Sequence, residues 1–97
     1  MPKYKLTQAA DDDLTELYSF TYAEFGEHQA DAYFESLENC LAHLAENPQL
    51  GLAVEFVRAS YRRFVHKRHS IYYKILKSEI LVVRLLGPGM SPERNLP

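Results

Sequence analysis

Hydrophobic residues recur at two different spacings along this 97-residue chain, and the spacing changes near residue 60. In residues 2–6, Tyr4 and Leu6 alternate with lysines, which is typical of a short β-strand. Apolar side chains then recur every three or four residues from Leu14 to Phe25 and from Ala30 to Leu44. That spacing places them on one face of a helix, so it predicts two amphipathic helices.

The residues that flank these segments predict where the helices begin and end. Thr7 is a suitable N-cap, because its hydroxyl can accept a hydrogen bond from a free amide of the first turn. Gly26 ends the first helix, and Asn47 followed by Pro48 ends the second. Two helices joined by one or two residues must pack as an antiparallel hairpin. Residues 49–57 are predicted to form a connecting loop.

The second part of the chain has a strand-like pattern. Residues 61–66, 70–76 and 80–86 are rich in Ile, Val, Tyr and Phe, and short polar connections separate them, which predicts an antiparallel meander. Residues 87–89 end the last strand, and residues 90–97 form one helical turn at most. The order β-α-α-β-β-β predicts an α+β fold, with the helical hairpin packed on one face of a small antiparallel twisted sheet.

Composition excludes several classes of protein. Hydrophobic residues make up 46% of the chain and charged residues 25%, which is typical of a folded domain, and 97 residues are enough for one domain. No apolar run approaches the roughly 20 residues of a membrane span, and the N-terminus lacks an apolar leader. The single cysteine, Cys40, excludes an internal disulfide and is expected to be a buried, inert thiol. We therefore expect a cytoplasmic protein with no membrane partner.

The charges are divided unequally along the chain. Residues 1–57 hold two lysines and eleven acidic residues, a balance of −9, whereas residues 58–97 hold nine basic and two acidic residues, a balance of +7. Together they give the net charge of −2. Between Arg58 and Lys77 there are seven basic residues and no acidic one. This division predicts two faces that meet different partners, or two halves that partly neutralise each other.

The sequence predicts no metal site or cofactor. His66 and His69 lie three residues apart, but they flank Lys67 and Arg68, whose charge repels a divalent cation. The carboxylates of Asp11–Asp13 point about 100° apart on a helix, so they are expected to form a solvated face that offsets the helix dipole.

Five segments, taken in order, give the chain a recognisable pattern. These are Lys3–Thr7 with the acidic start of the first helix, Leu44–Gly51, Tyr61–Val65 with Arg68–Lys74, Ile80–Leu86, and the tail residues Met90, Glu93, Arg94 and Leu96. Together they resemble the ParE toxins of bacterial toxin–antitoxin pairs, over nearly the whole chain. Many ParE sequences carry His and Asp in a Leu-His-x-x-Met-Asp tail, and this chain has Gly87 and Ser91 instead.

The resemblance implies the fold of the wider RelE/ParE superfamily and a growth-inhibiting toxin. Such a toxin binds DNA gyrase and traps its DNA-cleavage complex, without catalysis or a cofactor. A ParD-type antitoxin restrains it: the C-terminal segment of the antitoxin wraps the toxin, and its N-terminal part dimerises and binds operator DNA. The toxin therefore meets operator DNA only through the antitoxin.

The charge division adds two hypotheses about binding surfaces. In the first, an apolar groove between the hairpin and the sheet, edged by basic residues, accepts an acidic amphipathic segment of the antitoxin. The residues assigned to this surface are Arg58, Arg62, Arg63, Arg68, Tyr18 and Tyr22. In the second hypothesis, the tail contacts gyrase. The residues assigned to that contact are Arg84, Met90, Glu93, Arg94, Asn95 and Leu96.

Two alternatives remain open from the sequence. A RelE-like nuclease would cut mRNA in the ribosome, with Arg62, Arg63 and Arg84 supporting the phosphate and a general acid/base near the C-terminus. The chain has no Tyr or His after Tyr73, so only a histidine of the 66–69 region could take that role. The other alternative is a toxin that binds its antitoxin but has lost its target.

Overall fold

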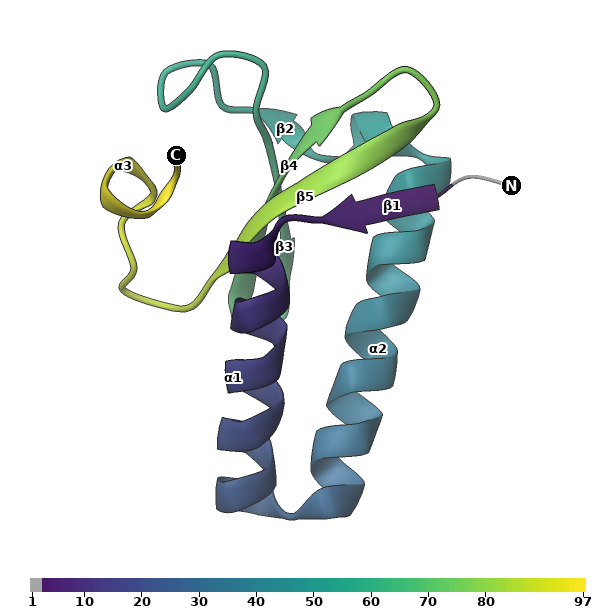
Figure 1. Ribbon diagram of the computed structural model, residues 1–97, viewed down its shortest axis with the longest axis vertical. Helices are drawn as coiled ribbons and strands as arrows, with labels where there is room; N and C mark the ends of the chain where they lie inside the picture. The colour runs from purple at the N-terminus through teal and green to yellow at the C-terminus, as the bar shows by residue number, and fades with distance from the viewer. Residues whose placement is uncertain (1–2) are drawn as a thin grey trace.

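The computed structural model describes residues 3–97, which form three helices, a short 3₁₀ turn and a five-stranded sheet (Figure 1). The helices are α1 (Gln8–Phe25), α2 (Glu27–Glu46) and α3 (Pro92–Asn95), and the 3₁₀ turn η1 is Pro48–Leu50. The strands are β1 (Lys3–Leu6), β2 (Leu52–Ala53), β3 (Arg62–His66), β4 (His69–Ile75) and β5 (Glu79–Leu86). The α+β fold with a helical hairpin is confirmed.

The strand order is β1-β5-β4-β3-β2, and the sheet is mixed. Strands β3, β4 and β5 form the predicted antiparallel meander, whereas β1 pairs in parallel with β5. The prediction of a wholly antiparallel sheet was wrong at this edge, because the partner of β1 lies more than 70 residues away and no tight turn sets its direction. The loop prediction also missed β2, whose two exposed residues pair with β3 and show no alternation of burial.

The two predicted helix boundaries at Thr7 and Gly26 are confirmed. The Thr7 hydroxyl accepts a hydrogen bond from the Ala10 amide at 3.1 Å and donates one to the Val83 carbonyl at 2.6 Å. Gly26 lies alone between α1 and α2 with a φ of 91°, a conformation that a residue with a Cβ adopts only with strain. A one-residue connection therefore reverses the chain and sets the helices side by side (Figure 1).

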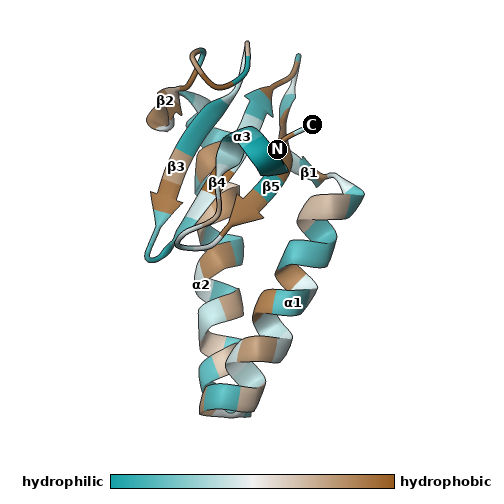
Figure 2. Ribbon diagram, turned by 90° about the vertical axis from the view of Figure 1, so that its left-hand side faces the viewer, coloured by the Kyte–Doolittle hydropathy of each residue, from teal (hydrophilic) through white to brown (hydrophobic). Residues whose placement is uncertain are grey.

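Each face of the sheet has its own hydrophobic cluster. The main cluster lies between the hairpin and the sheet; its central side chains are Leu37, Leu41, Leu44, Ile71, Tyr73, Ile80 and Val82. A smaller cluster, which we call the second cluster, covers the opposite face. It contains Val54, Tyr61, Tyr72, Val83, Leu86 and Leu96. The sheet covers only one end of the hairpin, so the other halves of α1 and α2 extend beyond it (Figures 1 and 2).

Within residues 3–97, no helix has both the length and the hydrophobicity needed to cross a membrane. The described part of the chain also contains no cluster of three His, Cys, Asp or Glu side chains placed to hold a metal ion. Cys40 is half-buried against the main cluster, and burial raises the pKa of its thiol. A thiol with a raised pKa is a poor nucleophile, in line with the inert role expected from the sequence.

Candidate partner-binding surfaces

A groove of about 420 Å³ lies on the sheet face opposite the hairpin, between β3–β4 and residues 87–93. We call it the basic groove, because the exposed side chains of Arg63, Lys67 and Arg68 line it and Glu93 is the one acidic residue among its described lining. Arg63 is held in place by a hydrogen bond from its Nε to the Ser70 hydroxyl at 3.2 Å. The groove therefore presents Arg63 from β3 and Arg68 from the β3–β4 turn, whereas the ammonium of Lys67, in the same turn, also lies 5.2 Å from the centre of the Tyr33 ring.

The same groove also exposes large apolar side chains. Phe56 is 87% exposed, Val65 49% and Met90 43%, and all three line the groove. Apolar surface beside cations suits an amphipathic segment whose polar face carries carboxylates. Bare nucleic-acid backbone would satisfy the cations but leave these side chains in water.

A second groove of about 380 Å³ lies between α1, α2 and β1, and we call it the hairpin groove. Its lining is mainly apolar and includes Tyr4, Leu14, Tyr18 and Phe34, with the rings of Tyr18 and Phe34 packed edge to face at 5.9 Å. The described residues around it include Asp11 and Glu38 but no lysine or arginine. Its charge is thus opposite to that of the basic groove.

The two tyrosines assigned to antitoxin binding lie on the hairpin. Tyr18 donates a hydrogen bond from its hydroxyl to Asp31 at 2.6 Å, which joins α1 to α2 and raises the pKa of Tyr18 to about 12. Tyr22 lies one turn further along α1, with its ring 6.2 Å from that of Tyr18, and is 50% exposed. We call the rings of Tyr18, Tyr22 and Phe25 the aromatic surface. It extends beyond the hairpin groove, and Phe25 is 68% exposed.

The four arginines assigned to antitoxin binding do not lie beside these tyrosines. Arg63 and Arg68 line the basic groove, on the other side of the sheet. Arg62 points toward the helical side, where it donates hydrogen bonds to the Gly51 carbonyl and to Gln49 Oε1. The prediction of a single groove that joins tyrosines and arginines was wrong, because alternation along β3 sends Arg62 and Arg63 to opposite faces.

Arg58 is occupied by the C-terminal segment. Its guanidinium donates to the carbonyls of Glu93, Leu96 and Pro97 at 3.2, 3.3 and 3.2 Å. Glu93 belongs to α3, whose last turn leaves carbonyl groups without partners inside the helix, and Leu96 and Pro97 follow that helix. Arg58 therefore holds residues 90–97, which we call the tail, against the second cluster.

The six tail-region residues assigned to gyrase divide into inward-facing and outward-facing groups. Leu96 is only 6% exposed and packs in the second cluster, and the guanidinium of Arg84 pairs with Asp13 and donates to the Asn95 carbonyl at 3.0 Å. The exposed members are Met90, Glu93 and Arg94, while Asn95 is half-buried. A partner that approaches from solvent can reach the exposed three directly.

Asp13 is a structural residue that the sequence argument missed. It was expected on a solvated face, yet its carboxylate contacts Arg84 at 2.7 Å and accepts the Leu85 amide at 2.9 Å. The local sequence does not distinguish Asp13 from Asp11 and Asp12. Only the packing of α1 against the edge of β5 determines which of the three aspartates makes these contacts.

His66 and His69 flank the β3–β4 turn and connect it to α2 through side-chain hydrogen bonds. His66 Nε2 lies 2.8 Å from the Ser36 hydroxyl, and His69 Nδ1 lies 3.0 Å from the Tyr33 hydroxyl. Burial lowers the pKa of both imidazoles, and the positive charge of Lys67 lowers the pKa of His66 further. Both shifts favour the neutral form of each ring in the folded protein.

Comparison with known proteins decides the family. Residues 4–91 match the family described as "ParE toxin of type II toxin-antitoxin system, parDE". The chain belongs to the ParE toxin family.

Relatives named "Toxin ParE1" span the whole domain. One from Mycobacterium tuberculosis (strain H37Rv) is 34% identical over 95 residues, which is 97% of each chain. Another from Caulobacter vibrioides is 28% identical over 96 residues, which is 99% of each chain. A solved structure titled "Chromosomal ParDE TA system from P. aeruginosa" has the same fold, with a TM-score of 0.76 and 19% identity over 90% of this chain and 96% of that chain.

Proposed function

We propose that this ParE-family protein acts in the cytoplasm, where it binds DNA gyrase, traps the DNA-cleavage complex and is neutralised by a ParD-type antitoxin. The observation that carries the proposal is the ParE match over residues 4–91, together with a tail that the fold holds against its second cluster and that presents Met90, Glu93 and Arg94 to solvent. A pre-ordered, exposed segment suits recognition of a protein surface, because little conformational entropy is lost on binding. Gyrase is the target that the resemblance to ParE toxins implies.

The contacts of the arginines argue against the nuclease alternative. Arg62 is bonded to the turn at Gly51, and Arg84 is paired with Asp13, so the two are occupied in different places. His66 and His69 contact hydroxyls of α2, and no carboxylate within residues 3–97 is hydrogen-bonded to either ring. RNA cleavage through a 2′-hydroxyl needs a positioned acid/base next to phosphate-binding cations. We therefore infer that the chain acts without catalysis.

The basic groove is the surface that we assign to the antitoxin. An acidic amphipathic segment would place carboxylates against Arg63 and Arg68 and cover Phe56 and Val65, folding as it binds. The same antitoxin reaches the aromatic surface at Tyr18 only by passing round an edge of the sheet, because the basic groove and the hairpin lie on opposite faces. Contact with operator DNA then comes through the antitoxin.

A gyrase supercoiling assay tests the proposed target. Purified toxin, gyrase, ATP and plasmid are expected to give less supercoiled product and more linear DNA, whereas ribosomes programmed with labelled mRNA leave that mRNA intact. Arg94→Ala should reduce the linear product, and Lys77→Ala, an exposed lysine in the β4–β5 turn, serves as the matched control. Cut mRNA with normal supercoiling would establish the nuclease instead. No effect in either assay would favour a toxin that has lost its target.

A salt titration tests the antitoxin surface. The double charge reversal Arg63→Glu and Arg68→Glu is expected to weaken toxin–antitoxin binding at low salt by roughly tenfold or more, and to flatten its dependence on ionic strength. Lys77→Glu changes the charge on a surface outside the groove and should have a much smaller effect. Unchanged affinity of the double variant would remove the basic groove from the proposal.

A further inference from the structure

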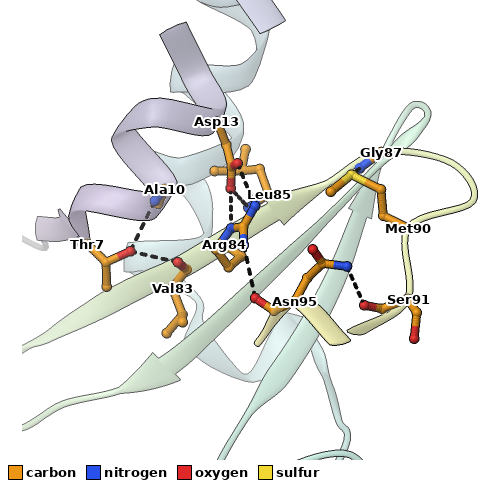
Figure 3. Close-up of polar contacts among 10 residues, drawn as sticks. All are labelled: Thr7, Ala10, Asp13, Val83, Arg84, Leu85, Gly87, Met90, Ser91 and Asn95. Atoms are coloured by element: carbon orange, nitrogen blue, oxygen red, sulfur yellow. Dashed lines mark hydrogen bonds and ion pairs between the residues drawn. The ribbon is translucent and has the colours of Figure 1, made fainter. Parts of the chain in front are cut away.

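A β-bulge gives Arg84 an orientation that regular alternation would not. Along β4 and β5, Tyr72 pairs with Arg84 but Tyr73 pairs with Val82, so Val83 is the extra residue. The bulge shifts the alternation, so that Val82 and Leu85 both face the hairpin. Such irregularities re-aim a side chain at the point where they occur. Arg84 therefore lies on the same face as Val83 and its partner Tyr72, and from there its guanidinium reaches Asp13 of α1 (Figure 3).

Asp13 receives this arginine at an open part of the sheet edge. Strand β1 pairs with β5 only as far as Val82, after which the chain enters α1. In the next stretch, Asp13 accepts the Leu85 amide at 2.9 Å and takes two hydrogen bonds from Arg84, from Nε at 2.7 Å and from Nη2 at 2.9 Å. The side chains of Asp13 and Arg84 are 12% and 20% exposed, so water weakens this pair little.

The remaining nitrogen of Arg84 reaches the tail. Nη1 donates to the Asn95 carbonyl at 3.0 Å, and the Asn95 side-chain amide donates to the Ser91 carbonyl at 2.7 Å (Figure 3). Along the chain, the exposed residues Glu93 and Arg94 lie between Ser91 and Asn95, whose carbonyls accept these two bonds. A guanidinium oriented by a carboxylate has its donors fixed in direction, so it fixes the position of the backbone that it binds.

We propose that Asp13 is a positioning residue that, through Arg84, holds the tail in the geometry needed to bind the toxin's target. This rests on the proposed function, in which the exposed part of the tail contacts gyrase. Gyrase meets Met90, Glu93 and Arg94, while Asp13 lies behind them and contacts no partner. A residue of α1 thereby affects target binding at the tail, although α1 contributes no side chain to the exposed surface of the tail.

Three variants separate positioning from general stability. Arg84→Lys keeps the charge beside Asp13 but removes the planar guanidinium, in which Nε and Nη2 bind that carboxylate while Nη1 reaches the Asn95 carbonyl. Asp13→Asn keeps the shape and removes the charge. Asp12→Asn is the matched control, because Asp12 is exposed and its hydrogen bond is to Gln8.

Two readouts follow each variant. The first is amide hydrogen exchange, comparing residues 94–96, whose amides are bonded within the tail, with the β4–β5 pair. The second is the toxin concentration that gives half-maximal linear DNA with gyrase, accompanied by growth arrest on induction. In Arg84→Lys and Asp13→Asn, tail exchange and the half-maximal concentration are expected to rise roughly tenfold, as for the loss of one hydrogen bond to a charged group. Exchange in β4–β5 should change far less, and Asp12→Asn should behave like wild type.

The outcomes distinguish this inference from the proposed function. If wild type poisons gyrase and Arg84→Lys does so equally well, the positioning role is refuted and the gyrase proposal stands. Unchanged tail exchange in both variants also refutes it. If wild type does not act on gyrase but growth arrest still requires Asp13 and Arg84 while Asp12→Asn remains toxic, the gyrase proposal fails and positioning holds for another target. Growth arrest that is indifferent to both residues refutes the positioning role.

Discussion

Replacing Tyr73 by phenylalanine is expected to destabilise the fold by about 2 kcal/mol, although it removes one oxygen atom only. Tyr73 is fully buried at the centre of the sheet. Its hydroxyl accepts the Gly51 amide at 2.9 Å and donates to the Pro48 carbonyl at 2.6 Å. These two bonds hold the turn between α2 and β2 against the sheet. Arg62 also binds this turn, because its guanidinium donates a hydrogen bond to the Gly51 carbonyl.

The magnitude follows from what the substitution leaves behind. Gly51 is buried, so its amide would lose its acceptor in a place that water does not reach. A buried unsatisfied donor costs about 1–3 kcal/mol, and the more apolar phenylalanine offsets little of this because the ring is already buried. For a domain of this size, a loss of about 2 kcal/mol lowers Tm by roughly 8–16 °C.

Urea unfolding at pH 7, followed by circular dichroism, measures the effect. Tyr61→Phe is the matched control, because Tyr61 is also buried, at 6% exposure. Its ring packs in the second cluster and lies 5.0 Å from Lys74 Nζ, and phenylalanine keeps both contacts. We expect the control to lose less than about 0.5 kcal/mol. Equal losses in the two variants would refute the reasoning, because the hydroxyl contacts of Tyr73 would then contribute nothing specific.

Two further predictions concern the tail and the response to pH. Leu96→Ala is expected to lower the free energy of unfolding by about 2 kcal/mol, at the low end for a buried leucine because the site lies near the chain end, while Arg94→Ala leaves it unchanged within about 0.5 kcal/mol. Equal stability of the two variants would show that Leu96 is not an anchor. Folding lowers the pKa of His66 and His69 below the ordinary 6.5, so the unfolded chain binds protons more readily, and stability should fall as pH drops below about 6.5. Urea unfolding at pH 7.0 and 5.5 should show this loss in wild type and a smaller one in H66Q/H69Q; equal losses would contradict it.

Local sequence determined the helices, the meander and the division of charge. Helix boundaries depend on side chains within about four residues of the ends, so Thr7 and Gly26 could be placed without knowledge of the fold. The strands of the meander are joined by short turns, which restrict them to antiparallel neighbours. The same local pattern placed Cys40 beside the apolar face of α2.

Only the tertiary structure decided which partners these elements meet. The parallel pairing of β1 with β5 joins residues more than 70 positions apart, and two exposed residues in β2 carry no detectable periodicity. The bulge at Val83 changes which side of β5 each later residue faces, and this is why Arg84, assigned to a partner from the sequence, pairs with Asp13 instead.

The candidate surfaces depended on tertiary structure most of all. The sequence indicated that the acidic and basic halves meet different partners or partly neutralise each other; the two grooves carry opposite charge, and Arg84 pairs with Asp13. It could not show that Tyr18 and Arg63 lie on opposite sides of the sheet, or that Arg58 is occupied by the tail. Residue type determines the charge that a side chain carries, whereas the packing of distant segments determines whether that charge is satisfied internally or left for a partner.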